Sequence, residues 1–410
     1  MSAYALDLKE SGWYSEYPFI QFDYDPRNVD RVTWILLGEC SSKIQHISGV
    51  PLQPDTADSL NQIYLAKGVH ATTAIEGNTL SEDQVEQRMA KTLELPRSQE
   101  YMGVEVDNIQ AAYNYIVGSI QRGSPLHVTP DEFTLMNFMV LKGLDLPADV
   151  EPGIYRTHRV GVSDYRAPSP EHIPELVERL CGWLNKTEWN QTIGSPFVVS
   201  ILKAILSHLY LAWIHPFGDG NGRTARLLEF DVLARAGVPT VCAHLLADYY
   251  NRTRPAYYAA LSRARKDPTH FVTYAVAGYV EGLRSQLKTI REQQINVAWI
   301  NYVYEWFDDQ PDSKPTRRRR EILLALSWEA EPVEVSGLAS LTPKLAALYA
   351  SVDPRALDRD ITFLEQNGLL VRDRRGRVSA NQERVLAFLP LVNRVPEPIE
   401  EQLLLGVADL

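Results

Sequence analysis

The chain has 410 residues, of which 45% are hydrophobic and 23% charged, and its formal net charge is −11 at pH 7. This composition is typical of a soluble globular protein, and the length predicts two or three domains rather than one core. The acidic balance excludes a protein that coats nucleic acid along its whole length, while a local basic patch stays compatible with it.

The sequence predicts a cytoplasmic protein without a membrane partner. The first ten residues, MSAYALDLKE, lack the basic region and apolar run of a signal peptide. The most apolar segment, residues 197–214, is marginal in length for a membrane span and contains Lys203 and His208, so we expect a buried core helix. The three cysteines lie far apart without a zinc-binding spacing, which favours free thiols in a reducing compartment.

Residues 1–110 are expected to form an N-terminal region with one prominent helix at about residues 56–77. Apolar residues recur there at helical spacing, and Gly77 supplies a natural C-terminal stop. Ser81 and Gln84 follow with the spacing of a capping box, which predicts the start of the next helix.

Residues 111–285 read as helix after helix and are expected to form an all-helical core. The exception is YRTHRVGVSDYRAPSP, residues 155–170, which alternates apolar and polar residues around Ser163–Asp164 and predicts a small β-hairpin. A long polar helix from about residue 268 to 307 leads into DDQPDSKP, a linker by composition. Residues 286–313 are therefore assigned to a helical connector and linker.

Residues 314–395 are predicted to form a winged helix-turn-helix domain, because helical segments precede LVRDRRGRVSA, a hairpin with Arg375–Gly376 at its turn. Residues 396–410 form an acidic tail. The predicted fold class is thus mainly α, a helical core with a small β-hairpin plus a C-terminal winged helix.

The C-terminal domain is rich in arginine, which leaves two interpretations open. Arg355 and Arg359 alternate with aspartates on the predicted recognition helix, and further arginines occur at 317–320 and along the wing. Such patches bind DNA phosphates. The interleaved aspartates fit a solvated face or a protein contact equally well.

The segment HPFGDGNGRTAR, residues 215–226, carries the strongest chemical signal. Gly220 and Gly222 permit positive φ and close backbone approach, and the N–H groups at the start of the following helix form an anion site. Arg223 and Arg226 are three residues apart, so they project from one helical face and can grip phosphate oxygens.

Two further side chains of this segment suit phosphate chemistry. Asp219 can hold Mg²⁺ beside the phosphates, since Mg²⁺ in proteins typically takes one or two carboxylates plus phosphate oxygens. His215 is the group able to remove a proton near neutral pH. A metal site made of His208 and His215 has no third ligand and fits the sequence poorly.

The segment resembles the signature of the Fic family (filamentation induced by cAMP), HPFx(D/E)GNGRxxR, at every defined position, and the resemblance covers roughly residues 56–283. It implies that residues 111–285 form a catalytic core that transfers AMP from ATP to a protein hydroxyl. His215 would deprotonate a target Ser, Thr or Tyr, and Asp219 would hold Mg²⁺ between the α- and β-phosphates.

The resemblance also implies the phosphate contacts. The implied phosphate-binding residues are Gly218, Gly220, Asn221, Gly222, Arg223 and Arg226. Among them Arg223 would hold the β-phosphate and Arg226 the γ-phosphate. Kinase-like relatives carry Lys at the position of Gly222, so the glycine favours adenylyl transfer over phosphorylation.

TTAIEGN, residues 72–78, resembles the inhibitory motif of the family, (S/T)xxxE(G/N). The resemblance implies that Glu76 pairs with Arg226 and occupies the place of the γ-phosphate. An ordinary ion pair that docks a helix is the alternative interpretation. Some relatives use the same glutamate to direct water at an AMP-modified protein, so the implied activities include AMP removal.

The base-binding residues are implied less directly. The predicted hairpin resembles the flap that lays a target segment across the site, with Val160 beside the nucleotide, although a purely structural hairpin fits as well. Tyr257 and Tyr258 stand where relatives seat adenine, and one of them can instead belong to the core. Arg265 stands where some relatives have Asn.

Two functions follow as hypotheses. The first is a self-inhibited adenylyltransferase that uses ATP and Mg²⁺ and modifies a protein target, for which the chain itself is one candidate. A homodimer, common among relatives with this layout, is compatible with it, and the sequence leaves the oligomeric state open. The second is a DNA-binding transcriptional regulator whose Fic core senses nucleotide. Transfer of another nucleotide, such as UMP, would keep the loop and change only the base pocket.

Overall fold

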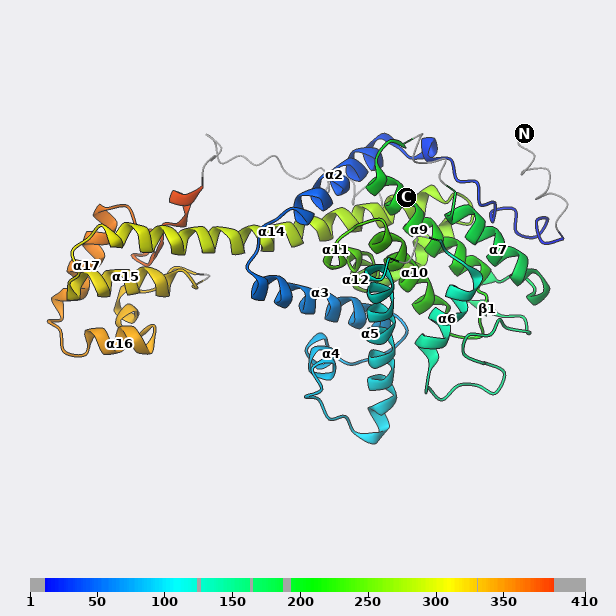
Figure 1. Ribbon diagram of the computed structural model, residues 1–410, viewed down its shortest axis with the longest axis horizontal. Coiled ribbons are helices and arrows are strands. Elements are labelled where there is room, and N and C mark those ends of the chain that lie inside the picture. Colours follow the sequence, from blue (N-terminus) through cyan, green and yellow to red (C-terminus); the bar gives the residue numbers. More distant parts are fainter. Residues whose placement is uncertain (1–11, 124–126, 163–164, 187–192, 330, 387–410) are drawn as a thin grey trace. The chain divides into compact units, whose positions relative to one another are not determined.

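The computed structural model describes residues 12–123, 127–162, 165–186, 193–329 and 331–386. The described residues are mostly helical with few strands, which confirms the mainly helical class. It forms two compact units, residues 1–288 and residues 289–410, and each is described by itself (Figure 1).

The first unit is built from helices around two central ones. Its longer helices are α2 (Arg31–Ser48), α3 (Pro54–Ala74), α5 (Glu100–Gln121), α6 (Pro130–Leu141), α7 (Ile173–Leu184), α9 (Pro196–Ile214), α10 (Asn221–Arg235) and the first half of α14 (Thr269–Asp308). The shorter helices are α4 (Glu82–Met89), α11 (Thr240–Ala243), α12 (Leu245–Arg252) and α13 (Arg254–Arg263). Helices α9 and α10 pack against each other, α2 and α7 cover α9, and α3, α5 and α6 cover α10 (Figure 1).

Helix α9 is central because its sequence is apolar on every face. By length and composition it could cross a membrane, and 83% of its most apolar window is buried inside the structure. A core helix passes the same test, so burial agrees with the expected role of this segment. The three cysteines are free and buried, also as expected.

Several helix starts follow from local sequence. The capping box of Ser81 and Gln84 opens α4, and Thr129 with Glu132 forms another at the start of α6. Helix α3 ends at Ala74, earlier than predicted, because the chain turns through residues 75–77 and Gly77 takes φ +104°. Glu76 therefore lies in a turn and not on the helix.

The predicted hairpin contains two short antiparallel strands, β1 (Gly161–Val162) and β2 (Tyr165–Arg166). Its predicted turn, Ser163–Asp164, lies outside the described residues. Tyr165 anchors the hairpin to the core, since its hydroxyl donates to the carbonyl of Trp213 at 2.6 Å.

The second unit contains the end of α14, then α15 (Lys314–Leu326), α16 (Pro343–Tyr349), α17 (Arg355–Gln366) and the antiparallel strands β3 (Leu370–Arg372) and β4 (Val378–Ala380). Its core includes Trp299, Ile322 and Leu364, all fully buried. The acidic tail predicted at residues 396–410 lies outside the described residues.

Candidate active site

The loop between α9 and α10 is fixed by bonds to its backbone. His215 takes φ 50° and ψ 58°, a left-handed conformation that costs energy in any residue except glycine. The side-chain amide of Asn221 donates to the carbonyl of Phe217 at 2.8 Å and accepts from its N–H at 3.0 Å. Arg156 donates to the carbonyl of His215 at 2.8 Å. The loop is therefore held from both sides in a strained shape.

Asn137, on α6, supports the same loop and was missed by the sequence analysis. Its Nδ2 donates to the carbonyl of Asp219 at 2.9 Å, and its Oδ1 accepts from the N–H of Gly153 at 3.0 Å. Gly220 takes φ +77°, and a Cβ there would lie 2.9 Å from Asn137 Nδ2. Asn137 is fully buried. The sequence feature that could have indicated its role is a single amide side chain on an otherwise apolar helix face.

The His215 side chain is arranged as a neutral base. Its Nδ1 lies 3.4 Å from the carbonyl of Ala212, so a proton on Nδ1 leaves Nε2 free to accept another. Burial lowers the pKa of His215 to about 4, although the contact with Ala212 acts in the opposite direction. The ring is therefore unprotonated at neutral pH.

Glu76 reaches Arg226, as the motif resemblance implied. Glu76 Oε1 lies 2.6 Å from Arg226 Nη2, which also donates to the carbonyl of Thr72 at 3.0 Å. Burial alone would raise the pKa of Glu76, but the charge of Arg226 and its hydrogen bond hold that pKa below the ordinary value. The Arg226 side chain is fully buried, and its Nε and Nη1 have no hydrogen-bond partner among the described residues.

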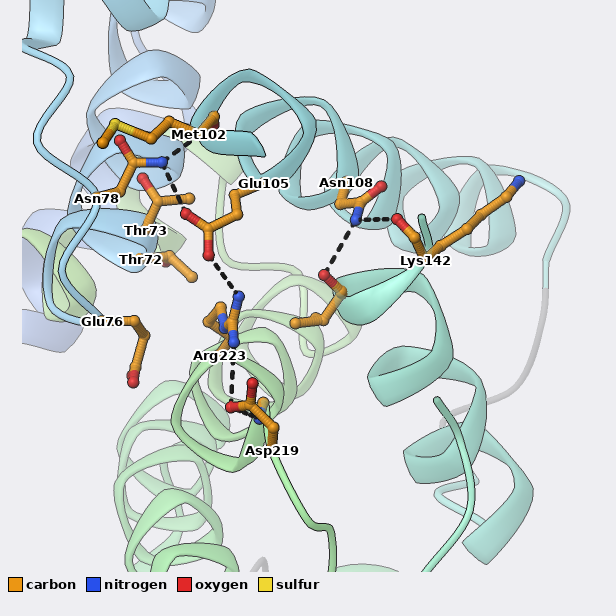
Figure 2. A network of polar contacts seen from close by, with 12 residues as sticks. Thr72, Thr73, Glu76, Asn78, Met102, Glu105, Asn108, Lys142, Asp219 and Arg223 are labelled. Atoms are coloured by element: carbon orange, nitrogen blue, oxygen red, sulfur yellow. Dashed lines mark hydrogen bonds and ion pairs between the residues drawn. The ribbon is translucent and has the colours of Figure 1, made fainter. Parts of the chain in front are cut away.

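Arg223 is held by two other carboxylates (Figure 2). Its Nη1 lies 3.0 Å from Glu105 Oε1 and its Nη2 lies 3.2 Å from Asp219 Oδ1. Glu105 comes from α5, and its second oxygen accepts from Asn78 Nδ2 at 2.9 Å. Burial raises the pKa of Glu105, with hydrogen bonding to Asn78 and the charge of Arg223 opposing that rise. The sequence analysis missed Glu105 and Asn78, because a single acid or amide carries no motif by itself.

Asp219 fits the role of a magnesium ligand by its chemistry. Its carboxylate is 46% exposed and accepts from the N–H of Gly220 at 2.5 Å through Oδ1, the oxygen that also faces Arg223. In the described part of the chain, no three His, Cys, Asp or Glu side chains group into a metal site. A cation at Asp219 would therefore take its other ligands from phosphate oxygens and water, which suits Mg²⁺.

A cavity of about 680 Å³ opens beside the loop. Its lining includes Glu76, His215, Gly222, Tyr257 and Tyr258. The two adjacent tyrosines both reach it, Tyr257 buried and Tyr258 about half exposed. The structure thus brings His215, the glycine-rich turn, the Glu76 carboxylate and the two tyrosines to one place.

Val160 and Gly218, two other predicted site residues, lie outside the lining of this cavity. Val160 does not line the cavity and instead accepts, through its carbonyl, from the N–H of Ala167 at 3.2 Å. Gly218 packs against Val150, where a Cβ would come within 2.9 Å. Arg265 does line the cavity, and its guanidinium lies 5.5 Å from the ring centre of Tyr165.

His208 lies behind the pocket, next to Tyr257 and Glu229. Its Nε2 lies 2.8 Å from the hydroxyl of Tyr257 and its Nδ1 lies 3.0 Å from Glu229 Oε2. Glu229 Oε1 accepts from Tyr250 at 2.7 Å. Both ring nitrogens are therefore engaged within a buried polar network behind Tyr257.

The comparisons with known proteins agree with this site. Residues 128–233 match the Fic/DOC family. The chain is 31% identical over 230 residues to protein adenylyltransferase fic-1 of Caenorhabditis elegans, covering 56% of this chain and 42% of that protein. It is 32% identical over 197 residues to protein adenylyltransferase Fic of Nematostella vectensis, covering 48% and 42%. The chain thus spans about two fifths of the length of these curated relatives.

Solved structures show the same fold. A Fic family protein from Desulfovibrio desulfuricans superposes with a TM-score of 0.55 at 19% identity, over 87% of this chain and 98% of that one. Fic-1 from C. elegans superposes with a TM-score of 0.53 at 25% identity, over 70% and 84%. The family match contains the whole 215–226 loop together with α9 and most of α10. Residues 128–233 of this chain therefore match a Fic domain.

Proposed function

We propose that the protein is a self-inhibited protein adenylyltransferase that moves AMP from ATP to a Ser, Thr or Tyr hydroxyl of a protein target. The observation that carries this proposal is the position of His215, a neutral base at the edge of a cavity that also holds Tyr257, Tyr258 and the glycine-rich turn. The relatives named as protein adenylyltransferases support the same reaction.

The proposed reaction is a displacement at phosphorus. The hydroxyl oxygen of the target attacks the α-phosphorus while His215 Nε2 takes the hydroxyl proton. The bond between the α-phosphorus and the bridging oxygen breaks, and diphosphate leaves. Such chemistry depends mainly on positioning and charge stabilisation, which a rigid loop supplies. Asp219 would hold Mg²⁺, whose charge would stabilise the leaving phosphates.

The start of α10 provides the anion site. The N–H groups of Asn221 and Gly222 open a helix and have no intrahelical acceptor, so they can donate to phosphate oxygens. The side chain of Asn221 is occupied by Phe217, which leaves its backbone for this role. Arg223 and Arg226 add two positive charges from the same helix.

Glu76 is the proposed inhibitor. Its carboxylate holds Arg226, the arginine proposed for the γ-phosphate, so ATP must displace it before all three phosphates can bind. A charge-assisted hydrogen bond contributes about 1.5–3 kcal/mol, and Glu76 is 31% exposed, so the lower end applies. In the removal of AMP, the same carboxylate, which lies close to His215, would direct a water molecule at the AMP-modified protein.

The finer structural assignments belong to the same proposal. The hairpin β1–β2 would accept the target as an added strand, with Val160 at its edge. In the second unit, α15 to α17 with β3–β4 would form a winged helix that contacts protein. Cytoplasmic location, a homodimer and self-modification stay predictions.

The competing hypothesis of a DNA-binding regulator is less well supported. Most arginines expected to face DNA have acidic partners within the second unit. These pairs are Arg317–Asp312, Arg318–Asp360, Arg319–Asp360, Arg359–Asp353, Arg372–Glu365 and Arg377–Asp373. Paired guanidinium groups attract phosphate weakly, because their charge is already compensated.

The test is incubation with Mg²⁺ and α-labelled ATP. Glu76→Gly should increase the label transferred to protein by about tenfold or more, since Arg226 is freed for the nucleotide. Adding His215→Ala should abolish transfer, and Glu94→Gly, in an exposed loop, should behave as the parent protein. ATP binding without any transfer of label would overturn the proposal in favour of a nucleotide sensor.

A further inference from the structure

We propose that Glu105 is a positioning residue that holds Arg223 for the phosphates of ATP, and that Asn78 holds Glu105 in turn. Asn78 belongs to the inhibitory segment, residues 72–78, which also carries Glu76. The inference rests on the proposed function and adds to it a requirement for this segment in the active enzyme.

Glu105 connects two parts of the chain that are far apart in sequence (Figure 2). Its Oε1 lies 3.0 Å from Arg223 Nη1 and its Oε2 accepts from Asn78 Nδ2 at 2.9 Å. The side chain of Glu105 is 15% exposed and that of Arg223 is 5% exposed. Both oxygens of Glu105 are therefore engaged in a largely water-free place, where such contacts fix orientation.

Asn78 is itself anchored, so Glu105 cannot swing freely. Asn78 Nδ2 also donates to the carbonyl of Met102, at 3.0 Å, and Asn78 Oδ1 accepts from the N–H of Leu80 at 3.1 Å. Asn78 is 7% exposed. The amide thus ties the turn after α3 to α5, directly beside Glu105.

The two carboxylates on Arg223 differ in what they can do when ATP arrives. Asp219 is 46% exposed and is the proposed magnesium ligand, so it can turn from Arg223 Nη2 toward the cation. Glu105 is locked and keeps its hold on Nη1. Arg223 would then present Nη2 to a phosphate without losing its orientation, which saves the entropy of ordering a flexible side chain.

The inhibitory segment therefore contains opposed functions two residues apart. Glu76 blocks Arg226, while Asn78 supports Arg223 through Glu105. Activation would require movement of the Glu76 side chain with Asn78 staying in place. Removal of the whole segment would release the inhibitor and also lose the support for Arg223.

The experiment measures nucleotide affinity in the Glu76→Gly full-length protein with Mg²⁺ present, by calorimetry. Glu105→Gln and Asn78→Ala should each weaken ATP binding, by about tenfold for Glu105→Gln, and leave AMP binding unchanged, since AMP lacks the β- and γ-phosphates. In a protein that also carries Arg223→Ala, Glu105→Gln should change nothing further. Asp107→Asn is the matched control, because Asp107 lies on the same helix and pairs with Arg88.

Three results would overturn the inference. Unchanged or tighter ATP binding in Glu105→Gln would make Glu105 a bystander or a second competitor for Arg223. Equal weakening of ATP and AMP would show a general structural role. A full effect that persists with Arg223→Ala would exclude action through Arg223. If Glu105→Gln does not fold, Asn78→Ala decides by the same criteria. Failure of the proposed function would instead appear as absent label transfer in the Glu76→Gly parent, whatever its affinities.

Discussion

Gly222 is the residue at which the proposed inhibition and the proposed nucleotide binding meet. A Cβ at this position would lie 2.3 Å from Glu76 Oε1 and 3.2 Å from Arg226 Nη1. A separation of 2.3 Å is far too short, so any side chain here must displace the glutamate. The contact between Glu76 and Arg226 thus requires that position 222 carries no side chain.

This geometry makes Gly222→Ala an activating change. The added methyl group should push the Glu76 carboxylate away from Arg226 and raise the basal transfer of label by about fivefold, corresponding to a loss of about 1 kcal/mol of inhibition. In the Glu76→Gly protein the same change should not raise transfer, because the obstructed atom is gone. Unchanged basal activity with Glu76 intact would contradict this account.

The buried position of His215 predicts an unusual pH dependence. The base must be unprotonated, and with a pKa of about 4 it is so at every pH above that value. For the Glu76→Gly protein, kcat/KM should be nearly constant between about pH 5.5 and 7.5, because the free-enzyme pKa governs this ratio. Removal of the Glu76 charge should lower the pKa of His215 further, since that charge raises it.

The measurement is kcat/KM against pH, with a melting curve at each pH to establish that the protein stays folded. A histidine with an ordinary pKa of about 6.5 would lose roughly tenfold in kcat/KM across the same interval. A decrease of that size would show that His215 is solvated in the working enzyme.

The chemistry of the 215–226 loop could be predicted because twelve contiguous residues carry it. The roles of Glu105 and Asn137 could not be predicted, because their partners in the loop lie 118 and 82 residues away in the sequence. Each is one polar residue on a helix, where a solvated face is the usual explanation. Their partners become visible only when the helices are packed.

At the scale of elements, the start of α15 shows how a basic run can serve folding. Asp360, on α17, is 1% exposed. Its Oδ2 accepts from Arg318 Nε at 2.9 Å and its Oδ1 accepts from Arg319 Nε at 2.7 Å. The hydroxyl of Tyr349 adds a third contact at 2.9 Å. One buried carboxylate thus joins α15, α16 and α17.

Replacing that carboxylate should loosen the second unit. Asp360→Asn leaves Arg318 buried without a counter-charge, which costs about 3–5 kcal/mol. Hydrogen exchange should accelerate in α15 and α17 and leave α9 and α10 unchanged. Asp312→Asn removes an exposed partner of Arg317 and serves as the control, with little effect expected. Equal exchange rates in α15 for the parent and Asp360→Asn would contradict this prediction.

The boundaries of elements were predictable where local chemistry decides them. The capping box at Ser81 marked the start of α4 correctly. The end of α3 was placed too late, because the apolar pattern continues through Ile75 while the backbone already turns toward Gly77. Periodicity reports burial, and Ile75 is buried in a turn as well as it would be on a helix.

At the scale of the whole molecule, the sequence predicted more than one domain, and the chain forms two compact units. The helical class could be predicted because apolar periodicity extends over most of the first unit, and the Fic core because residues 215–226 carry the family motif. The pairing of basic residues in the second unit could not be predicted, because the sequence gives the charge of each residue and not the residues that surround it in the fold. Arg318 and Arg319 belong to the basic run for which DNA binding and a solvated face were both open, and both contact Asp360.

The left-handed backbone conformation of His215 lowers the stability of the fold at the residue proposed as the catalytic base. That conformation costs about 1–2 kcal/mol for a residue with a side chain, whereas glycine adopts it freely and asparagine more readily than most. Under the proposed mechanism, a chain with either residue at this position would be inactive yet harder to unfold, and a change of that size alters cellular abundance several-fold. Selection for stability and abundance alone would therefore favour replacement of His215. Retention of the imidazole is the expected consequence of selection for its proposed role as the base.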